Sequence, residues 1–70
     1  MLEINIKDYR FRNEKEDTML AFNVITSEMI FLKGKSKEFI QNLLENKKKK
    51  KKISEKNLEI LKNKKIIMGD

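Results

Sequence analysis

The sequence predicts a small α+β domain in which a three-stranded antiparallel sheet is followed by two or three helices. Three short apolar-rich segments, at about residues 2–12, 18–25 and 28–32, are joined by polar turns. Two amphipathic segments follow, at about residues 36–48 and 54–64. The chain has 70 residues, so we expect a single domain across it, burying only about 60% of its unfolded surface.

The first strand is expected to be interrupted. Apolar and polar side chains alternate from Leu2 to Ile6, which is the period of a half-buried strand. The apolar phase then moves by one residue at Tyr9, and such a shift turns the side chains to the opposite face. We therefore expect a bulge or break near Lys7–Asp8. The polar run at residues 13–17 is expected to form the next turn.

The second and third strands follow in quick succession. Residues 19–25, MLAFNVI, are almost continuously apolar and suit a central strand. Thr26–Ser27 would form a short turn, and residues 29–32 the third strand. Gly34 is free to take a positive φ where that strand ends. Together the three strands would form an antiparallel meander.

Two helices are expected after the sheet. Ser36 and Ser54 are the expected N-caps, because a serine hydroxyl can accept a hydrogen bond from a free amide of the first turn. Leu58 and Leu61 of the second helix would face the core, and residues 66–68 would add a strand or cover the core. The apolar stripe of the first helix has helical spacing and comprises Phe39, Ile40, Leu43 and Leu44.

Charge is distributed unevenly along the chain. Residues 1–32 carry four basic and six acidic side chains, and residues 33–70 carry thirteen basic and five acidic, which gives the net charge of +6. Six of the lysines form the run 47–52. This run fits a solvated linker, a patch for nucleic acid, or a patch for an acidic partner.

The residue types exclude several classes of chemistry. The chain has no His and no Cys, so it offers no imidazole base, thiolate nucleophile, disulfide or zinc-thiolate site. We therefore expect no enzyme activity, no catalytic residue, no metal and no cofactor. No apolar run approaches the ~20 residues that cross a bilayer, and the N-terminus lacks the pattern of a signal peptide. We expect a cytoplasmic protein.

An ordered set of motifs runs through roughly residues 9–68. It comprises Arg12-x-Glu14, Leu20-Ala21-Phe22-Asn23, Thr26, a strand ending at Leu32, Phe39-Ile40, Leu43-Leu44, and Leu58-x-x-Leu61 running into Ile66-Ile67. This order resembles the PQQ-biosynthesis protein D (PqqD) family, which are peptide-recognition elements of ribosomal natural-product pathways. The resemblance implies a small winged-helix-like domain that binds the leader of a precursor peptide. It also implies a separate modifying enzyme as partner, often a radical SAM maturase.

The resemblance further implies where a leader peptide binds. In that family the peptide adds a strand beside the third strand, in a cleft completed by the last helix. One departure is that the family has an additional short helix before the last one, and only residues 46–53 fill that interval here. Within the third strand, alternate side chains share a face, so one pair should join the core and the other should line the peptide. The implied peptide-binding residues are Glu28, Met29, Ile30, Phe31, Leu32, Leu58, Leu61 and Lys62.

Other functions are left open by the sequence. The alternative is a small basic nucleic-acid-binding protein of the winged-helix type, whose basic half contacts phosphates. Against it, the four phenylalanines alternate with apolar residues and are expected in the core rather than as stacking platforms. Arg10 and Arg12 are either solvated strand residues or partners for an acidic leader side chain. An exposed strand edge also permits pairing of two copies into a dimer.

Overall fold

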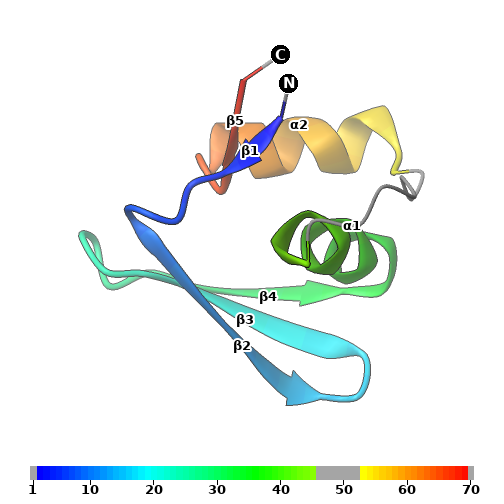
Figure 1. The fold of residues 1–70 in the computed structure, drawn as a ribbon, viewed down its shortest axis with the longest axis horizontal. Coiled ribbons are helices and arrows are strands. Elements are labelled where there is room, and N and C mark those ends of the chain that lie inside the picture. Colours follow the sequence, from blue (N-terminus) through cyan, green and yellow to red (C-terminus); the bar gives the residue numbers. More distant parts are fainter. Residues whose placement is uncertain (1, 46–52, 70) are drawn as a thin grey trace.

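The computed structural model describes residues 2–45 and 53–69, and Figure 1 shows how the elements are arranged. Strands β2, β3 and β4 form an antiparallel sheet in that order, and β1 pairs with β5 in a separate two-stranded sheet. The three-stranded sheet followed by two helices confirms the expected α+β class. The elements are β1 (Glu3–Ile4), β2 (Tyr9–Lys15), β3 (Thr18–Asn23), β4 (Met29–Lys33), α1 (Gly34–Leu44), α2 (Glu55–Asn63) and β5 (Ile67–Met68).

The expected first strand is two strands, and the chain breaks between them where the apolar phase moves. β1 ends at Ile4, the chain turns, and β2 begins at Tyr9. The amide of Tyr9 donates to the carbonyl of Asn5 over 3.1 Å, and the amide of Asn5 donates to the carbonyl of Ile66 over 2.9 Å. The break therefore lets β1 join the C-terminal strand while β2 joins β3.

Two strand ends differ from the sequence expectation. Residues 13–17 were expected as a turn, but β2 continues to Lys15, with a register shift between Asn13 and Lys15. Pairing with the start of β3 gives these polar residues backbone partners. β3 ends at Asn23 rather than residue 25, because the Asn23 side-chain oxygen accepts from the amides of Ile25 and Thr26. An Asx turn of this kind competes with the strand ladder.

Helix α1 begins directly at the end of β4. Gly34 has a φ of 59°, as the sequence analysis expected, and Lys33 occupies the N-cap position without a side-chain hydrogen bond. The expectation that Ser36 caps this helix is therefore wrong. The glycine turns the chain sharply, so the helix starts two residues earlier. The expected extension of α1 to residue 48 and the lysine run 47–52 lie outside the described residues.

Helix α2 is capped at both ends. The hydroxyl of Ser54 accepts from the amide of Asn57 over 3.2 Å, which confirms the expected N-cap. After the helix, Lys65 has a φ of 60°, and the amides of Lys65 and Ile66 donate to the carbonyls of Lys62 and Leu61. These two bonds form a Schellman motif, which normally has glycine at the left-handed position.

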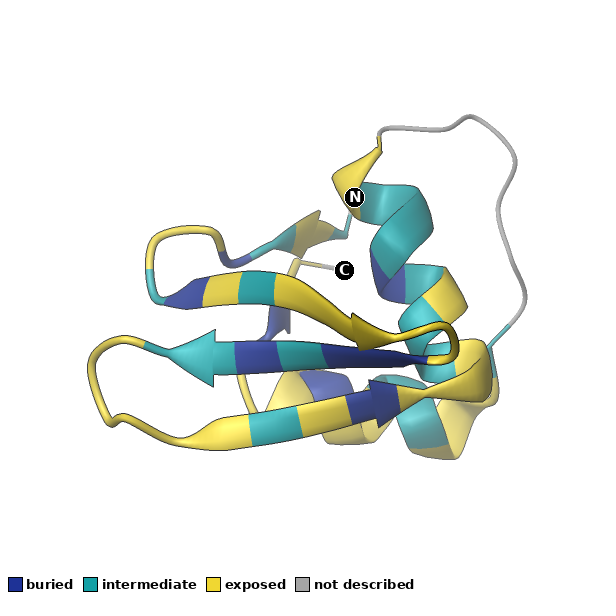
Figure 2. Cartoon of the chain, turned by 90° about the horizontal axis from the view of Figure 1, so that it is seen from below, coloured by how far each residue is buried: buried dark blue, intermediate teal, exposed yellow. Residues whose placement is uncertain are grey.

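The core lies where α1 is held between the three-stranded sheet and the layer formed by α2 with β1 and β5 (Figure 1). Ile40 of α1 is fully buried there. Figure 2 shows buried and partly buried residues along β3, and exposed residues alternating with more buried ones along β4, as a sheet covered on one face requires. The buried apolar residues are Tyr9, Met19, Ala21, Leu32, Ile40, Leu61, Ile66 and Ile67.

Candidate peptide-binding edge

Strand β4 is an edge of the three-stranded sheet, because within residues 2–45 and 53–69 it pairs with β3 alone. The Asn23 amide donates to the carbonyl of Glu28 over 2.9 Å, which sets the register of the hairpin. In an antiparallel sheet, successive residues direct their backbone groups to alternate sides. Ile30 and Leu32 therefore bond to β3, while Met29 and Phe31 direct their amides and carbonyls to the open edge.

The side chains of β4 divide between two faces, which answers the question that alternation left open. Ile30 and Leu32 face the helices, and Leu32 is buried while Ile30 packs against the core. Met29 and Phe31 face the other way and are 61% and 58% exposed. The residues with outward backbone groups are thus also those with exposed apolar side chains.

The last helix contributes less to this edge than the resemblance implied. Leu61 is 2% exposed and belongs to the core, and Leu58 is half-buried and packs against that core. Lys62 is exposed. The contact that joins the helix end to β4 is instead an ion pair, in which Lys64 Nζ lies 3.0 Å from Glu28 Oε2. These two residues are 36 positions apart, so no local pattern in the sequence could reveal the pair.

Arg10 and Arg12 lie on β2, at the opposite edge of the sheet from the open side of β4. Strands are spaced about 4.8 Å apart, so a peptide added beside β4 would run about 14 Å from β2. Arg12 is paired with Glu14 at 2.6 Å, and Arg10 donates to the carbonyls of Ile6 and Tyr9. This arrangement disfavours a direct pair between either arginine and a peptide on β4, and the pairing stays a prediction.

The phenylalanines do not all lie in the core. Phe11 and Phe39 pack against the buried cluster, as expected. Phe22 and Phe31 lie instead on the face of the sheet turned away from α1, because each alternates with a core residue along its strand. Apolar alternation in the sequence could not reveal this face, since only the pairing register decides which of two apolar neighbours points inward.

The described residues offer no candidate metal centre. Residues 2–45 and 53–69 hold no group of three or more acidic, His or Cys side chains that could ligate a metal ion. Within the same ranges, neither helix has the length and apolar character needed to cross a membrane.

Comparisons with known proteins identified no relative of the chain. No family model, no curated protein and no solved structure matches the chain.

Proposed function

We propose that this domain binds an extended peptide as an additional strand beside β4. The observation that carries the proposal is the edge at Met29 and Phe31, where backbone groups that have no partner strand within residues 2–45 and 53–69 accompany exposed apolar side chains. Backbone pairing supplies affinity in this mode of recognition, and the flanking side chains select among peptides. Main-chain recognition also needs no catalytic group in the domain.

The edge at β4 is better suited to this role than the edge at β2. On β2, the Tyr9 amide already donates to Asn5, and the Tyr9 carbonyl accepts from the Arg10 guanidinium over 3.0 Å. The register shift between Asn13 and Lys15 further distorts that edge. The C-terminal strand β5 does not compete for β4, because it pairs with β1.

The peptide we propose is the leader of a ribosomally made precursor, held for a separate modifying enzyme such as a radical SAM maturase. This finer assignment rests on the order of elements, three paired strands followed by helices, that the PqqD-like motifs imply. The Lys64–Glu28 ion pair supports it, since it ties the end of α2 to the start of β4. The domain would act as a non-catalytic adaptor.

Calorimetric titration with leader segments of short precursor peptides encoded beside the gene tests the proposal. We expect one peptide to bind per domain. Met29→Pro should abolish the binding and keep the fold, because proline is tolerated at the first residue of an edge strand and removes an amide that faces outward.

The matched control places proline on the other edge. The bond from the Val24 amide to the Asp8 carbonyl sets the register of β2, and by the same alternation Asn13 directs its amide to the open side. Asn13→Pro should therefore leave peptide binding unchanged. Absence of binding to every neighbouring precursor, or equal loss in both variants, would contradict the proposal.

Recognition of DNA by α2 as a winged helix has less support. The charged positions of that helix alternate in sign along the chain, in the order Glu55, Lys56, Glu59 and Lys62. A gel-shift assay at about 50 and 200 mM salt separates the functions, because phosphate-driven binding weakens by orders of magnitude across this range. Peptide binding through backbone pairing should change far less.

A further inference from the structure

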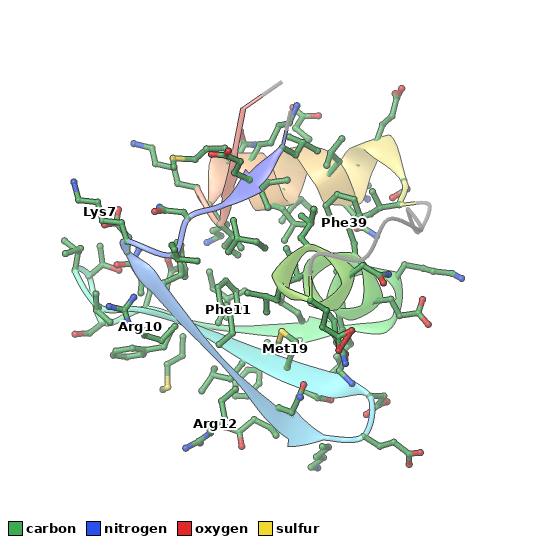
Figure 3. All side chains as sticks on the ribbon, in the orientation of Figure 1. Lys7, Arg10, Phe11, Arg12, Met19 and Phe39 are labelled. Atoms are coloured by element: carbon green, nitrogen blue, oxygen red, sulfur yellow. The ribbon has the colours of Figure 1, made fainter. Side chains whose placement is uncertain are left out.

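The outer face of the three-stranded sheet, turned away from both helices, is a second surface. Figure 3 shows Arg10 and Arg12 on this side, whereas Phe11 and Met19 lie on the side of α1. The register aligns Arg10 with Phe22 and Met29 in one cross-strand row, and Arg12 with Leu20 and Phe31 in the next. We name these six residues the outer face.

The outer face is apolar over β3 and β4. Met29 and Phe31 are mostly exposed, and Leu20 and Phe22 are half-buried. No element among residues 2–45 and 53–69 packs on these four side chains, although the opposite face of the same sheet is covered by α1. A contiguous apolar patch on a sheet that is otherwise layered marks a surface for a partner.

The border of the outer face along β2 is positively charged. Glu14 neutralises Arg12 in part through their 2.6 Å ion pair. Arg10 donates to two backbone carbonyls and has no carboxylate partner within the described residues. The internal segment 46–52 consists of Asn and six lysines, so its composition supplies neither apolar side chains nor carboxylates for this face.

The positive charges of the outer face favour some binding partners over others. Two copies of the chain would each bring a net charge of +6 and the same two arginines, so self-association here is opposed by repulsion. An acidic partner is attracted by the net positive charge of the chain and by the two arginines. A helix is about 10 Å across with side chains, which matches the width of three strands spaced about 4.8 Å apart.

We propose that the outer face docks an acidic amphipathic helix of a partner protein. Its apolar stripe lies over Leu20, Phe22, Met29 and Phe31, and carboxylates along one side meet Arg10 and Arg12. This surface is the face of the sheet rather than its edge, and although the side chains of Met29 and Phe31 border both, the helix and an edge-bound peptide are different ligands. The inference therefore does not depend on the proposed peptide function.

An NMR titration with two synthetic 18-residue helix-stabilised peptides tests the inference. Both carry the same leucine stripe, and it is flanked by glutamates in one and by lysines in the other. The glutamate peptide should shift the resonances of the outer face, including the side-chain Nε–H groups of Arg10 and Arg12. The lysine peptide should bind at least about tenfold more weakly, because like charges then face each other.

Variants with equal changes in net charge localise the effect. Arg10→Glu with Arg12→Glu should weaken binding of the glutamate peptide at least about tenfold. Lys35→Glu with Lys56→Glu, at the starts of the two helices, should leave its affinity within about twofold because the altered charges lie off the outer face. Phe31→Ser tests the apolar part without touching the arginines, and should also weaken binding.

Four outcomes of the peptide titrations and of sedimentation would overturn the inference. The first two are equal affinity for both peptides, and no resonance shifts at about 1 mM peptide, which corresponds to a binding free energy near −4 kcal/mol or less favourable. The other two are shifts confined to α2, and a dimer in sedimentation that Phe31→Ser dissociates. Tighter binding of a single-stranded oligothymidine to the same resonances would assign the face to nucleic acid instead, and also overturns it. None of these results involves Met29→Pro or the precursor peptides, so the peptide proposal is judged separately.

Discussion

Two buried polar side chains hold the N-terminal segment against the end of α2. The Tyr9 hydroxyl donates to the carbonyl of Lys64 over 2.6 Å, and the Asn5 side-chain amide donates to the carbonyl of Lys65 over 3.0 Å. Both residues are almost fully buried. These bonds satisfy carbonyls at a helix end, where the chain itself supplies too few partners.

Tyr9→Phe should lower the free energy of unfolding by about 1–2 kcal/mol, because it leaves the Lys64 carbonyl without its buried donor. Thermal and urea denaturation measure the change. Asn42→Ala is the control, since it removes a bond from the Asn42 side chain to the Glu38 carbonyl that is exposed. That variant should be neutral or slightly stabilised, because alanine favours the helix. Equal losses of unfolding free energy in both variants would show that burial does not determine how much a hydrogen bond contributes to stability.

Lys65→Gly should raise the free energy of unfolding by about 1 kcal/mol. Lys65 has a φ of 60°, a conformation that costs an L-residue energy and costs glycine none. Lys62→Gly removes a lysine from inside the same helix and should instead cost about 1 kcal/mol. Urea titrations should show changes of opposite sign in the free energy of unfolding of the two variants. A loss of stability in both variants would contradict the Schellman geometry.

At the scale of elements, the two helices begin in different ways. The N-cap of α2 is Ser54, whose hydroxyl accepts a hydrogen bond from a backbone amide. The N-cap of α1 is Lys33, the last residue of β4, which makes no side-chain hydrogen bond there. Ser36 and Ser54 each stand at the start of an amphipathic segment, so the sequence alone predicts an N-cap at both. Gly34 changes the outcome, because its left-handed conformation moves the start of α1 ahead of Ser36.

Ser54→Ala should therefore destabilise the domain by about 1 kcal/mol, the usual cost of losing an N-cap. Ser36→Ala should be neutral or stabilising, since Ser36 lies within the first turn of α1, where alanine has the higher helix propensity. Denaturation of the two single variants gives the comparison. A larger loss of stability in Ser36→Ala than in Ser54→Ala would instead support Ser36 as the N-cap of α1.

At the scale of the whole molecule, stability depends on one core shared by every layer. The hydrophobic core of a chain of this size rarely supplies more than about 3–5 kcal/mol of stability. Ile40 has no exposed surface, and its helix contacts β1, β3 and β4. Each layer is therefore stable only while α1 is packed.

Ile40→Ala should remove about 2–5 kcal/mol and leave the domain largely unfolded at 37 °C. Leu44→Ala deletes a comparable side chain from the same helix at a position that is 41% exposed, and should cost less than about 1 kcal/mol. Circular dichroism melts of both variants measure this difference. Cooperative unfolding of Ile40→Ala at the wild-type temperature would contradict a single shared core.

Much of the fold follows from local patterns in the sequence. Alternation of apolar residues located the strands, the phase change after Ile6 located the break, and Gly34 and Ser54 marked where elements end or begin. Each of these signals acts within a few residues. The site is different, because an edge exists only after strands have paired.

The amino-acid sequence alone determined the α+β class, the order of elements and the residue types of the third strand, because propensity, alternation and capping are local properties. Only the tertiary structure decided that β5 pairs with β1, so that β4 has no second partner among the described strands, and that Leu61 belongs to the core. It also decided that Phe22 and Phe31 share the outer face with Arg10 and Arg12. Strand order and register join residues far apart in the chain, and the short-range pattern is compatible with more than one such pairing.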